Sequence, residues 1–195
     1  MLFFEKSSFK RYYPMELTGQ IIGYIAMAIY IVSYFQRKQK HIIFFQCLAT
    51  TLFATSFAML GAMTGMILNI ISAIRAILFL YKKQLKTDNN IWLIGFFATY
   101  AATYVLAFTV FQKEFTVTNA IIELLPIIGM VATTFGYRAK TANGVRVGGI
   151  VNEPAWLIYD IITKNNGAVL ANAFSICSIF LGFLREKKSR KPIKQ

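Results

Sequence analysis

The sequence predicts an all-α polytopic membrane protein with seven transmembrane helices, arranged as two parallel three-helix repeats joined by a linker helix. Three observations lead to this prediction. Apolar residues make up 56 % of the 195 residues, charged residues only 15 %, and the mean hydropathy is +0.53, whereas a soluble domain carries about 25 % charged residues. Seven apolar segments approach the length of about 20 residues that a bilayer-spanning helix needs. The first three segments also resemble the last three.

The elements follow from these apolar runs. We expect spans at residues 17–35, 42–60, 65–81, 91–111, 120–137, 147–163 and 167–184. The sixth span has the weakest signal, because it contains Asn152, Glu153, Pro154 and Asp160.

The spans divide the chain into domains. Residues 17–81 form the first triple-helix bundle, 91–111 the linker helix and 120–184 the second triple-helix bundle. Residues 1–16 are a polar and aromatic lead-in, which is either a dispensable extension or a short helix at the membrane surface. Residues 185–195 are a basic tail that we expect to be disordered and solvated.

The distribution of positive charge predicts the orientation. Of 21 Lys and Arg residues, 15 fall in the loops and tail of one side, 5 on the other side, and Arg75 lies within a span. Basic loops stay in the cytoplasm, so the C-terminus is expected in the cytoplasm and the N-terminus outside. The net charge of +13 therefore reflects topology, and no motif of a nucleic-acid-binding protein is present.

The repeat is visible in two pairs of segments. QIIGY at 20–24 matches PIIGM at 126–130, and LNIIS at 68–72 matches ANAFS at 171–175. The offsets are similar and the matches fall in corresponding helices of each triplet. Parallel repeats of this kind are related by an axis along the membrane normal, and their substrate sites lie near the midplane.

Four motifs give the chain a family resemblance. They are FQRKQK after the first span, LGAMTGMILNIISAIR through the third, ELLPIIG in the fifth and AWLIYD in the sixth. On these motifs most of residues 17–185 resembles the YgjV-type bacterial inner-membrane proteins, and is more distantly similar to the SWEET, PQ-loop and PnuC seven-helix carriers. The resemblance implies a bacterial inner-membrane location. It also implies that Asn69 and Asn172 flank a substrate, as asparagines of the third and seventh helices do in SWEET-type carriers.

Polar residues within the spans are the candidate binding site. Asn69 and Ser72 are three residues apart and share a helix face, and Asn172 and Ser175 repeat this spacing. Together with Trp156 they are expected to bind a polar solute. The alternative is that they only bond a neighbouring helix, which contributes about 0.6 to 2 kcal/mol.

Three charged residues form a second candidate group. Arg75, Glu153 and Asp160 are expected in a buried charge network, with Arg75 and Glu153 paired because they lie at similar depth. Alternatively, Arg75 extends to the headgroups or contacts an anionic group of a substrate, and Asp160 lies at the outer interface.

Two prolines, Pro126 and Pro154, are candidate hinges. The first repeat has Gln20 where the second has Pro126. A rocking motion that used one proline hinge in each repeat would therefore lack the proline of the first repeat.

The sequence contains no nucleophile–base constellation, metal-ligand cluster or phosphate loop, so we expect neither an enzyme nor a bound cofactor or metal. The expected function is transport of a small polar solute by alternating access between the two bundles. The alternative is a non-transporting receptor or assembly factor on the same scaffold. The expected partners are the lipid bilayer and an unidentified small molecule, without nucleic acid. The sequence leaves open whether the protein forms a homo-oligomer.

Overall fold

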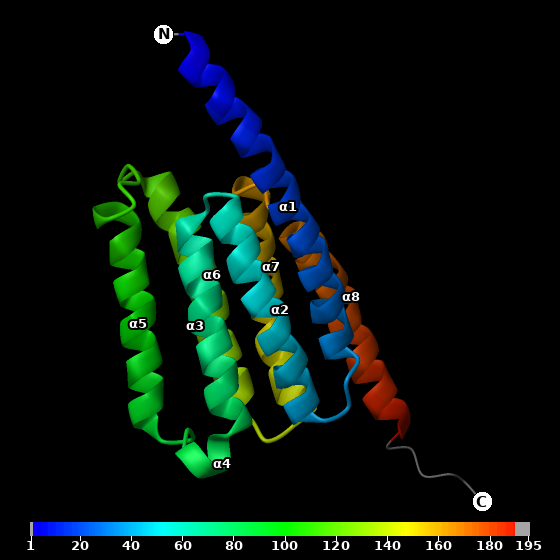
Figure 1. Cartoon of the computed structure of the whole chain (residues 1–195). Helices are drawn as coiled ribbons and strands as arrows, with labels where there is room; N and C mark the ends of the chain where they lie inside the picture. Colours follow the sequence, from blue (N-terminus) through cyan, green and yellow to red (C-terminus); the bar gives the residue numbers. More distant parts are fainter. Residues whose placement is uncertain (1, 190–195) are drawn as a thin grey trace, which may run out of the picture.

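The computed structural model describes residues 2–189, and side chains within residues 15–186. Within this part the chain is entirely helical and contains eight helices (Figure 1). They are α1 (Leu2–Tyr34), α2 (Gln39–Met59), α3 (Met63–Leu80), α4 (Lys82–Leu85), α5 (Asn90–Thr109), α6 (Val117–Arg138), α7 (Ala142–Ile162) and α8 (Asn166–Ser189). The side chains of the expected lead-in, up to residue 14, and residues 190–195 of the expected tail lie outside the described part.

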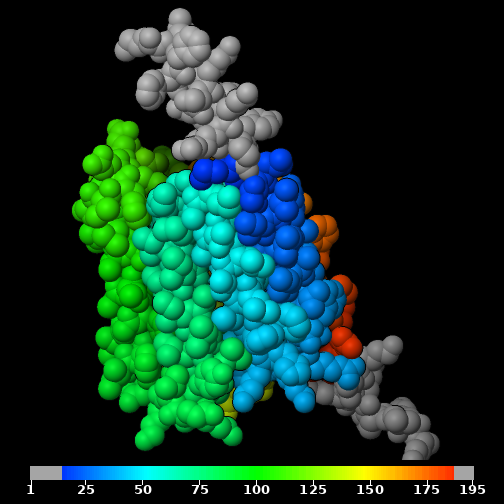
Figure 2. Space-filling model, viewed as in Figure 1, coloured from blue at the N-terminus to red at the C-terminus, as the bar shows by residue number. Residues whose placement is uncertain are grey.

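Six of the long helices surround a common centre. In ring order they are α1, α2, α3, α6, α7 and α8, and α8 packs back against α1. Helix α5 lies outside this ring and packs mainly against α3 and α6 (Figure 1). The space-filling view shows α5, α3, α2 and α1 side by side on one face (Figure 2). The ring leaves its interior available for side chains from six helices.

The helix bounds agree with most of the expected spans. Six described segments are long and apolar enough to cross a membrane, namely Met15–Tyr34, Gln39–Met59, Met63–Leu80, Asn90–Thr109, Val117–Arg138 and Asn166–Glu186. Helix α7 has 21 residues but is not among them. Its polar and charged residues, which weakened the sequence signal, lie in the middle of a continuous helix.

The expected lead-in has a helical backbone. Residues 1–16 were predicted to be either a dispensable extension or a short helix at the membrane surface, and the backbone is helical without a break from Leu2 to Tyr34. The residues before Pro14 can continue directly into the span, because the chain contains no helix-ending glycine there.

Polarity is distributed as expected for a protein surrounded by lipid. On α3, Ile70, Ile74 and Ile77 are 44 %, 51 % and 47 % exposed, whereas Arg75 is 2 % exposed. Apolar side chains therefore face outward and polar ones inward. The apolar helix α3 can carry Arg75 because this arginine is buried inside the protein and does not face lipid.

Small residues allow two of the helix pairs to approach closely. A Cβ built on Gly167 of α8 would lie 2.5 Å from the carbonyl carbon of Gly23 in α1. A Cβ on Gly148 of α7 would lie 2.8 Å from the carbonyl oxygen of Ala132 in α6. Such backbone contacts are typical of membrane helices packed through small residues.

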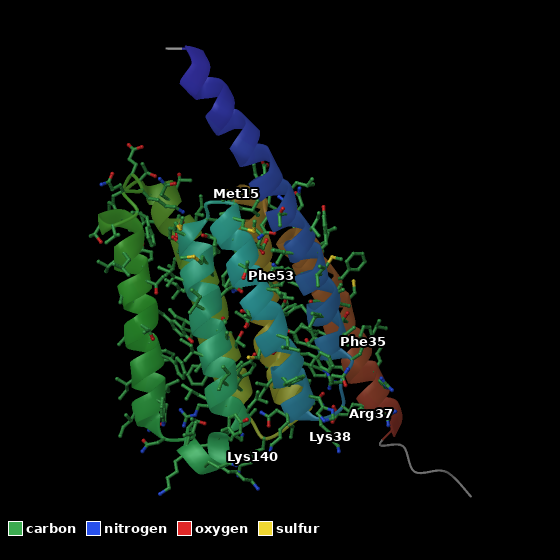
Figure 3. All side chains as sticks on the ribbon, viewed as in Figure 1. Met15, Phe35, Arg37, Lys38, Phe53 and Lys140 are labelled. Carbon is green, nitrogen blue, oxygen red and sulfur yellow. The ribbon has the colours of Figure 1, made fainter. Side chains whose placement is uncertain are left out.

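The two ends of the bundle differ in charge. Arg37 and Lys38 of the α1–α2 loop lie at the same end as Lys140 of the α6–α7 loop, and Met15 lies toward the other end (Figure 3). We call the first the basic end; it also carries α4. The opposite end carries the loops α2–α3, α5–α6 and α7–α8, and we call it the far end.

Candidate functional site

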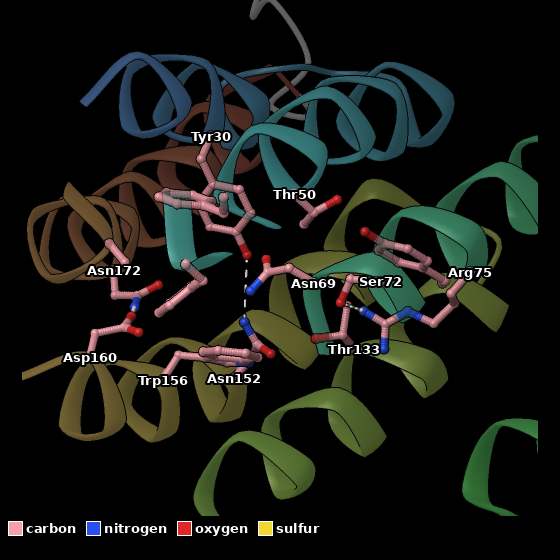
Figure 4. Close-up of a pocket in the computed structure, with 14 residues that line it drawn as sticks. Tyr30, Thr50, Asn69, Ser72, Arg75, Thr133, Asn152, Trp156, Asp160 and Asn172 are labelled. Atoms are coloured by element: carbon pink, nitrogen blue, oxygen red, sulfur yellow. Dashed lines mark hydrogen bonds between the residues drawn. The ribbon is translucent and has the colours of Figure 1, made fainter. Parts of the chain in front are cut away.

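A cavity of about 40 Å³ lies inside the ring. All six ring helices contribute to it, whereas α5 does not. It is lined by Tyr30, Thr50, Phe53, Phe57, Asn69, Ser72, Arg75, Thr133, Tyr137, Asn152, Trp156, Asp160, Ala168 and Asn172 (Figure 4). This space corresponds to about three buried water molecules.

The cavity brings together most of the residues that the sequence singled out. Asn69, Ser72, Asn172 and Trp156 line it, although they come from three different helices. Ser175 does not line it: this serine is fully buried, and its hydroxyl has no hydrogen-bond partner within the described residues. Spacing along the helix thus placed three of the four Asn and Ser residues of the two repeats at the cavity.

The two asparagines have different partners. Asn69 donates to the carbonyl of Gly65 one turn earlier in its own helix, at 2.9 Å. Asn172 donates to the Oδ2 of Asp160 at 2.5 Å and thereby joins α8 to α7. A bond to a neighbouring helix is therefore formed by Asn172, whereas Asn69 bonds within its own helix in the described part of the chain.

Arg75 reaches the cavity from α3 and is surrounded by neutral groups. Its guanidinium carbon lies 5.1 Å from the centre of the Tyr137 ring. Its hydrogen-bond acceptors are the Met130 carbonyl (2.7 Å), the Tyr100 hydroxyl (3.0 Å), the Thr134 hydroxyl (3.1 Å) and the Ser72 hydroxyl (3.4 Å). These bonds connect α3 to α6 and α5. The side chain does not extend to the headgroups, because it is 2 % exposed.

The expected pair between Arg75 and Glu153 is wrong. Glu153 is fully buried on α7, and its Oε1 accepts hydrogen bonds from Tyr34 (2.7 Å), Tyr30 (2.9 Å) and Asn152 (3.0 Å). Helix α6 lies between α3 and α7 in the ring. Similar depth in the membrane was therefore not enough for contact, because the two residues lie on different sides of the ring.

Asp160 lies inside the protein and not at an interface. It is 1 % exposed and lines the cavity beside Asn172. Its Oδ1 has no hydrogen-bond partner among the described residues. The three charged residues of the expected network are all buried, but no described ion pair joins any two of them.

Aromatic rings surround Trp156. The centre of its ring system lies 6.2 Å from that of Phe57 and 5.6 Å from that of Tyr159, the latter in an edge-to-face arrangement. A ring of a bound solute could contact this group, and the same contacts also serve as ordinary packing.

The candidate hinges lie in continuous helices. Pro126 is buried within α6, and Pro154 is exposed within α7. Three residues after Pro126, a Cβ on Gly129 would lie 2.8 Å from the Oδ1 of Asn152. The stretch after Pro126 is therefore packed closely on the cavity-lining part of α7.

Side-chain links close the bundle at its basic end. The Tyr137 hydroxyl donates to Gln46 at 2.7 Å, and Gln39 donates to the Tyr137 carbonyl at 3.0 Å. Both links join α2 to α6 on the side of the cavity that faces the basic end. No sequence pattern indicates this arrangement, since glutamine and tyrosine are common in many environments.

Arg146 forms a second closure at this end. It pairs with Glu186 of α8 at 3.0 Å and donates to the carbonyl of Gln36 at 2.9 Å. Its side chain is 3 % exposed although it belongs to the first turns of α7. We call this group, made of Arg146, Glu186 and the Gln36 carbonyl, the Arg146 clasp. In the sequence Arg146 counted only as a loop charge.

At the far end a second pocket of about 390 Å³ lies between the loops. Lys113 lines it and pairs with Glu123, a carboxylate that is 1 % exposed on α6. Lys113 also lies 5.9 Å from the Tyr159 ring, which packs against Trp156. The pair thus stands between this pocket and the aromatic group beside the cavity.

Tyr30, Tyr34 and Asn152 are the main residues that the sequence analysis missed. Two tyrosines four residues apart share one helix face, which was the available signal. Aromatic residues make up 15 % of the chain, so this spacing alone did not distinguish them.

Comparison with known proteins identifies a family. The family model Imp-YgjV, described as bacterial inner membrane protein, matches residues 17–190. No curated protein and no solved structure matches the chain.

Proposed function

The chain belongs to the YgjV family of bacterial inner membrane proteins, and from this premise we propose that it is a carrier for a small polar solute. The family and the apolar helices make it a multi-pass membrane protein. In the proposal, the solute binds in the cavity inside the ring and reaches either side by alternating access.

One observation carries the proposal. The cavity is lined from α1, α2 and α3 and also from α6, α7 and α8. Eight of its lining side chains carry polar groups other than aromatic hydroxyls or the indole nitrogen, namely Thr50, Asn69, Ser72, Arg75, Thr133, Asn152, Asp160 and Asn172. Tyr30 and Tyr137 also line it. Polar and ionisable residues inside membrane proteins usually mark substrate or ion pathways.

The helix arrangement supports a 3+1+3 architecture. With α7 as the seventh span, α1–α3 and α6–α8 form two triplets and α5 links them. Exchanging the triplets maps the contact between α1 and α8 onto that between α6 and α3, and both contacts exist. This is the relation expected for parallel repeats about an axis along the membrane normal.

The orientation follows from the basic end. Arg37, Lys38 and Lys140 gather there, and positively charged loops remain in the cytoplasm. The basic end is therefore assigned to the cytoplasm, and the far end to the outside.

Alternating access gives the links at the basic end a role. Gln46–Tyr137, Gln39–Tyr137 and the contact of Arg146 with the Gln36 carbonyl each join the first triplet to the second. In an inward-open state these links must break. In the present conformation they separate the cavity from the cytoplasmic side.

The test is solute flux. The protein is reconstituted in vesicles, and uptake of labelled amino acids, sugars, nucleosides and vitamins is measured after a thermal-shift screen has selected binders. Replacing Asn69 and Asn172 by alanine should abolish uptake while folded protein remains in the membrane. Thr99→Ala on α5 is the matched control, since its hydroxyl bonds only carbonyls of its own helix. Unchanged uptake by the asparagine variant would contradict the proposed site.

A second candidate function rests on the small size of the cavity. At about 40 Å³ it holds few atoms, and the Arg146 clasp joins α7, α8 and the α1–α2 loop. A receptor or assembly factor would bind a ligand without moving it. Saturable binding with no flux of the same compound in sealed vesicles would favour this function over transport.

A further inference from the structure

Two buried charges of opposite sign line the same cavity, and neither has an ionic partner among the described side chains. Arg75 is 2 % exposed and Asp160 is 1 % exposed. The ion pairs of the described part involve other residues, namely Lys82–Asp88, Lys113–Glu123 and Arg146–Glu186. Burying an unpaired charge is costly, so both residues call for a partner.

The guanidinium of Arg75 is satisfied unevenly. Its Nη1 donates three hydrogen bonds, to the Met130 carbonyl and to the hydroxyls of Tyr100 and Thr134. Its Nη2 makes one long bond of 3.4 Å to Ser72, and its Nε has no partner. Two adjacent N–H groups on one edge of arginine match the two oxygens of a carboxylate. The unsatisfied edge is thus the one suited to a carboxylate.

Asp160 offers the complementary group. Its Oδ2 accepts the bond from Asn172, while its Oδ1 is buried without a partner in the described part. Trp156, one turn earlier on the same helix, also lines the cavity. A carboxylate beside an indole ring suits an ammonium group, which the carboxylate attracts directly and the ring attracts through its face.

The two groups lie on opposite sides of the cavity. In Figure 4, Asp160 and Asn172 lie on one side and Arg75 with Ser72 on the other, and Asn69, Asn152 and Trp156 lie between them. Arg75 and Asp160 therefore do not neutralise one another directly. A solute with charges at both ends would neutralise both at once, whereas a simple cation or anion would neutralise only one.

We propose that the cavity selects a small zwitterion, whose carboxylate binds the Nε–Nη2 edge of Arg75 and whose ammonium group binds Asp160. The inference rests on the proposed function for its site and names the class of solute. The amides of Asn69 and Asn152 would contact the middle of the solute. Glu153 is left out because it does not line the cavity; three donors bond its Oε1, and its Oε2 is buried without a partner among the described residues.

The experiment measures binding to the purified full chain in lipid nanodiscs by calorimetry. The probes are glycine, β-alanine and γ-aminobutyrate, which separate the two charges by increasing lengths. Propionate, propylammonium and propionamide serve as the anionic, cationic and neutral comparisons. We expect one of the three zwitterions to bind at least about tenfold more tightly than each comparison compound, because each comparison compound lacks at least one of the two charged contacts.

Variants separate binding from folding. Asp160→Asn keeps the size of the side chain and should weaken the zwitterion about tenfold or more while leaving propionate unchanged. Arg75→Lys keeps the charge but loses the two-pronged edge, and it should also weaken the zwitterion. Arg138→Gln and Asp88→Asn are the matched controls, because this arginine and aspartate lie in contact at the basic end, away from the cavity.

The outcomes distinguish the inference from the proposed function. Equal binding of zwitterions and propionamide, or full zwitterion affinity in Asp160→Asn, would overturn the inference. Flux of a neutral solute that does not depend on Asp160 would also overturn it and leave transport in place. Zwitterion binding that requires both residues but produces no flux would uphold the inference and refute transport.

Discussion

The hydrogen bond from Tyr34 to Glu153 gives the most direct test of the interior network. The Tyr34 hydroxyl lies 2.7 Å from Oε1, and both side chains are at most 1 % exposed. Tyr34→Phe removes the donor and keeps the ring, which packs edge-to-face on Tyr30 with centres 5.7 Å apart. Because hydrogen bonds to charged groups contribute about 1.5–3 kcal/mol, we expect the free energy of unfolding to fall by that amount.

The assay is equilibrium unfolding of the purified protein in mixed micelles, followed by circular dichroism. Tyr24→Phe is the matched control, since Tyr24 lies on the same helix but is 41 % exposed. Combining Tyr34→Phe with Glu153→Gln completes a double-mutant cycle, in which directly bonded residues show a coupling energy of about 0.5–3 kcal/mol. If Tyr34→Phe costs no more than Tyr24→Phe, or the coupling is absent, the bond does not stabilise the protein and the reasoning fails.

Three further predictions concern packing, the Arg146 clasp and topology. Gly167→Ala should lower the free energy of unfolding by about 1–3 kcal/mol, because the added Cβ would meet the backbone of α1. The control Gly95→Ala, whose Cβ meets nothing within 4 Å, should be neutral or stabilising by up to about 1 kcal/mol. Equal effects of the two substitutions in thermal unfolding would contradict the close contact. Arg146→Gln should speed hydrogen exchange in the α1–α2 loop and in the last turns of α8, measured by mass spectrometry, and unchanged rates there would show that the clasp does not restrain them. In a chain whose two native cysteines are replaced by serine, Lys140→Cys should react with an impermeant maleimide only after cell lysis and Glu114→Cys in intact spheroplasts; the reverse pattern would contradict the orientation.

Periodicity and composition were sufficient to predict the long helices and to identify the faces of α3 and α8 that point into the protein. Asn69 and Asn172 line one cavity because each lies on the polar face of its helix and the helices pack in a ring. A single face per helix can be read from spacing alone. Their roles in binding remain predictions.

The error over Arg75 and Glu153 has a geometric cause. Depth in the membrane follows from counting residues at about 1.5 Å each, but the position around the ring depends on which helices are neighbours. Arg75 meets Thr134 of the adjacent α6, and Glu153 meets Tyr30 and Tyr34 of α1. Such neighbours cannot be read from one chain without knowing the packing order.

The Arg146 clasp could not be predicted for a related reason. Its acceptor on the α1–α2 loop is the backbone carbonyl of Gln36, and a carbonyl leaves no trace in residue type. Buried cations at helix ends are often held by backbone in this way. Its ionic partner Glu186 lies 40 residues away on α8, so this contact too depends on a packing of helices that residue spacing does not reveal.

The two boundaries between the proposed triplets, α1–α3 and α6–α8, are unlike each other. Between α1 and α8 the backbones of Gly23 and Gly167 nearly touch, while between α3 and α6 the guanidinium of Arg75 bridges by exchangeable hydrogen bonds. The contact between α1 and α8 has no side chains to rearrange at these glycines, so it would act as the pivot of a motion between the two triplets. At the contact between α3 and α6, Arg75 can exchange one hydrogen-bond acceptor for another, so these two helices could shift relative to each other. Any motion between the two triplets should therefore be asymmetric, with displacements that increase from the glycines at the α1–α8 contact toward Arg75 at the α3–α6 contact.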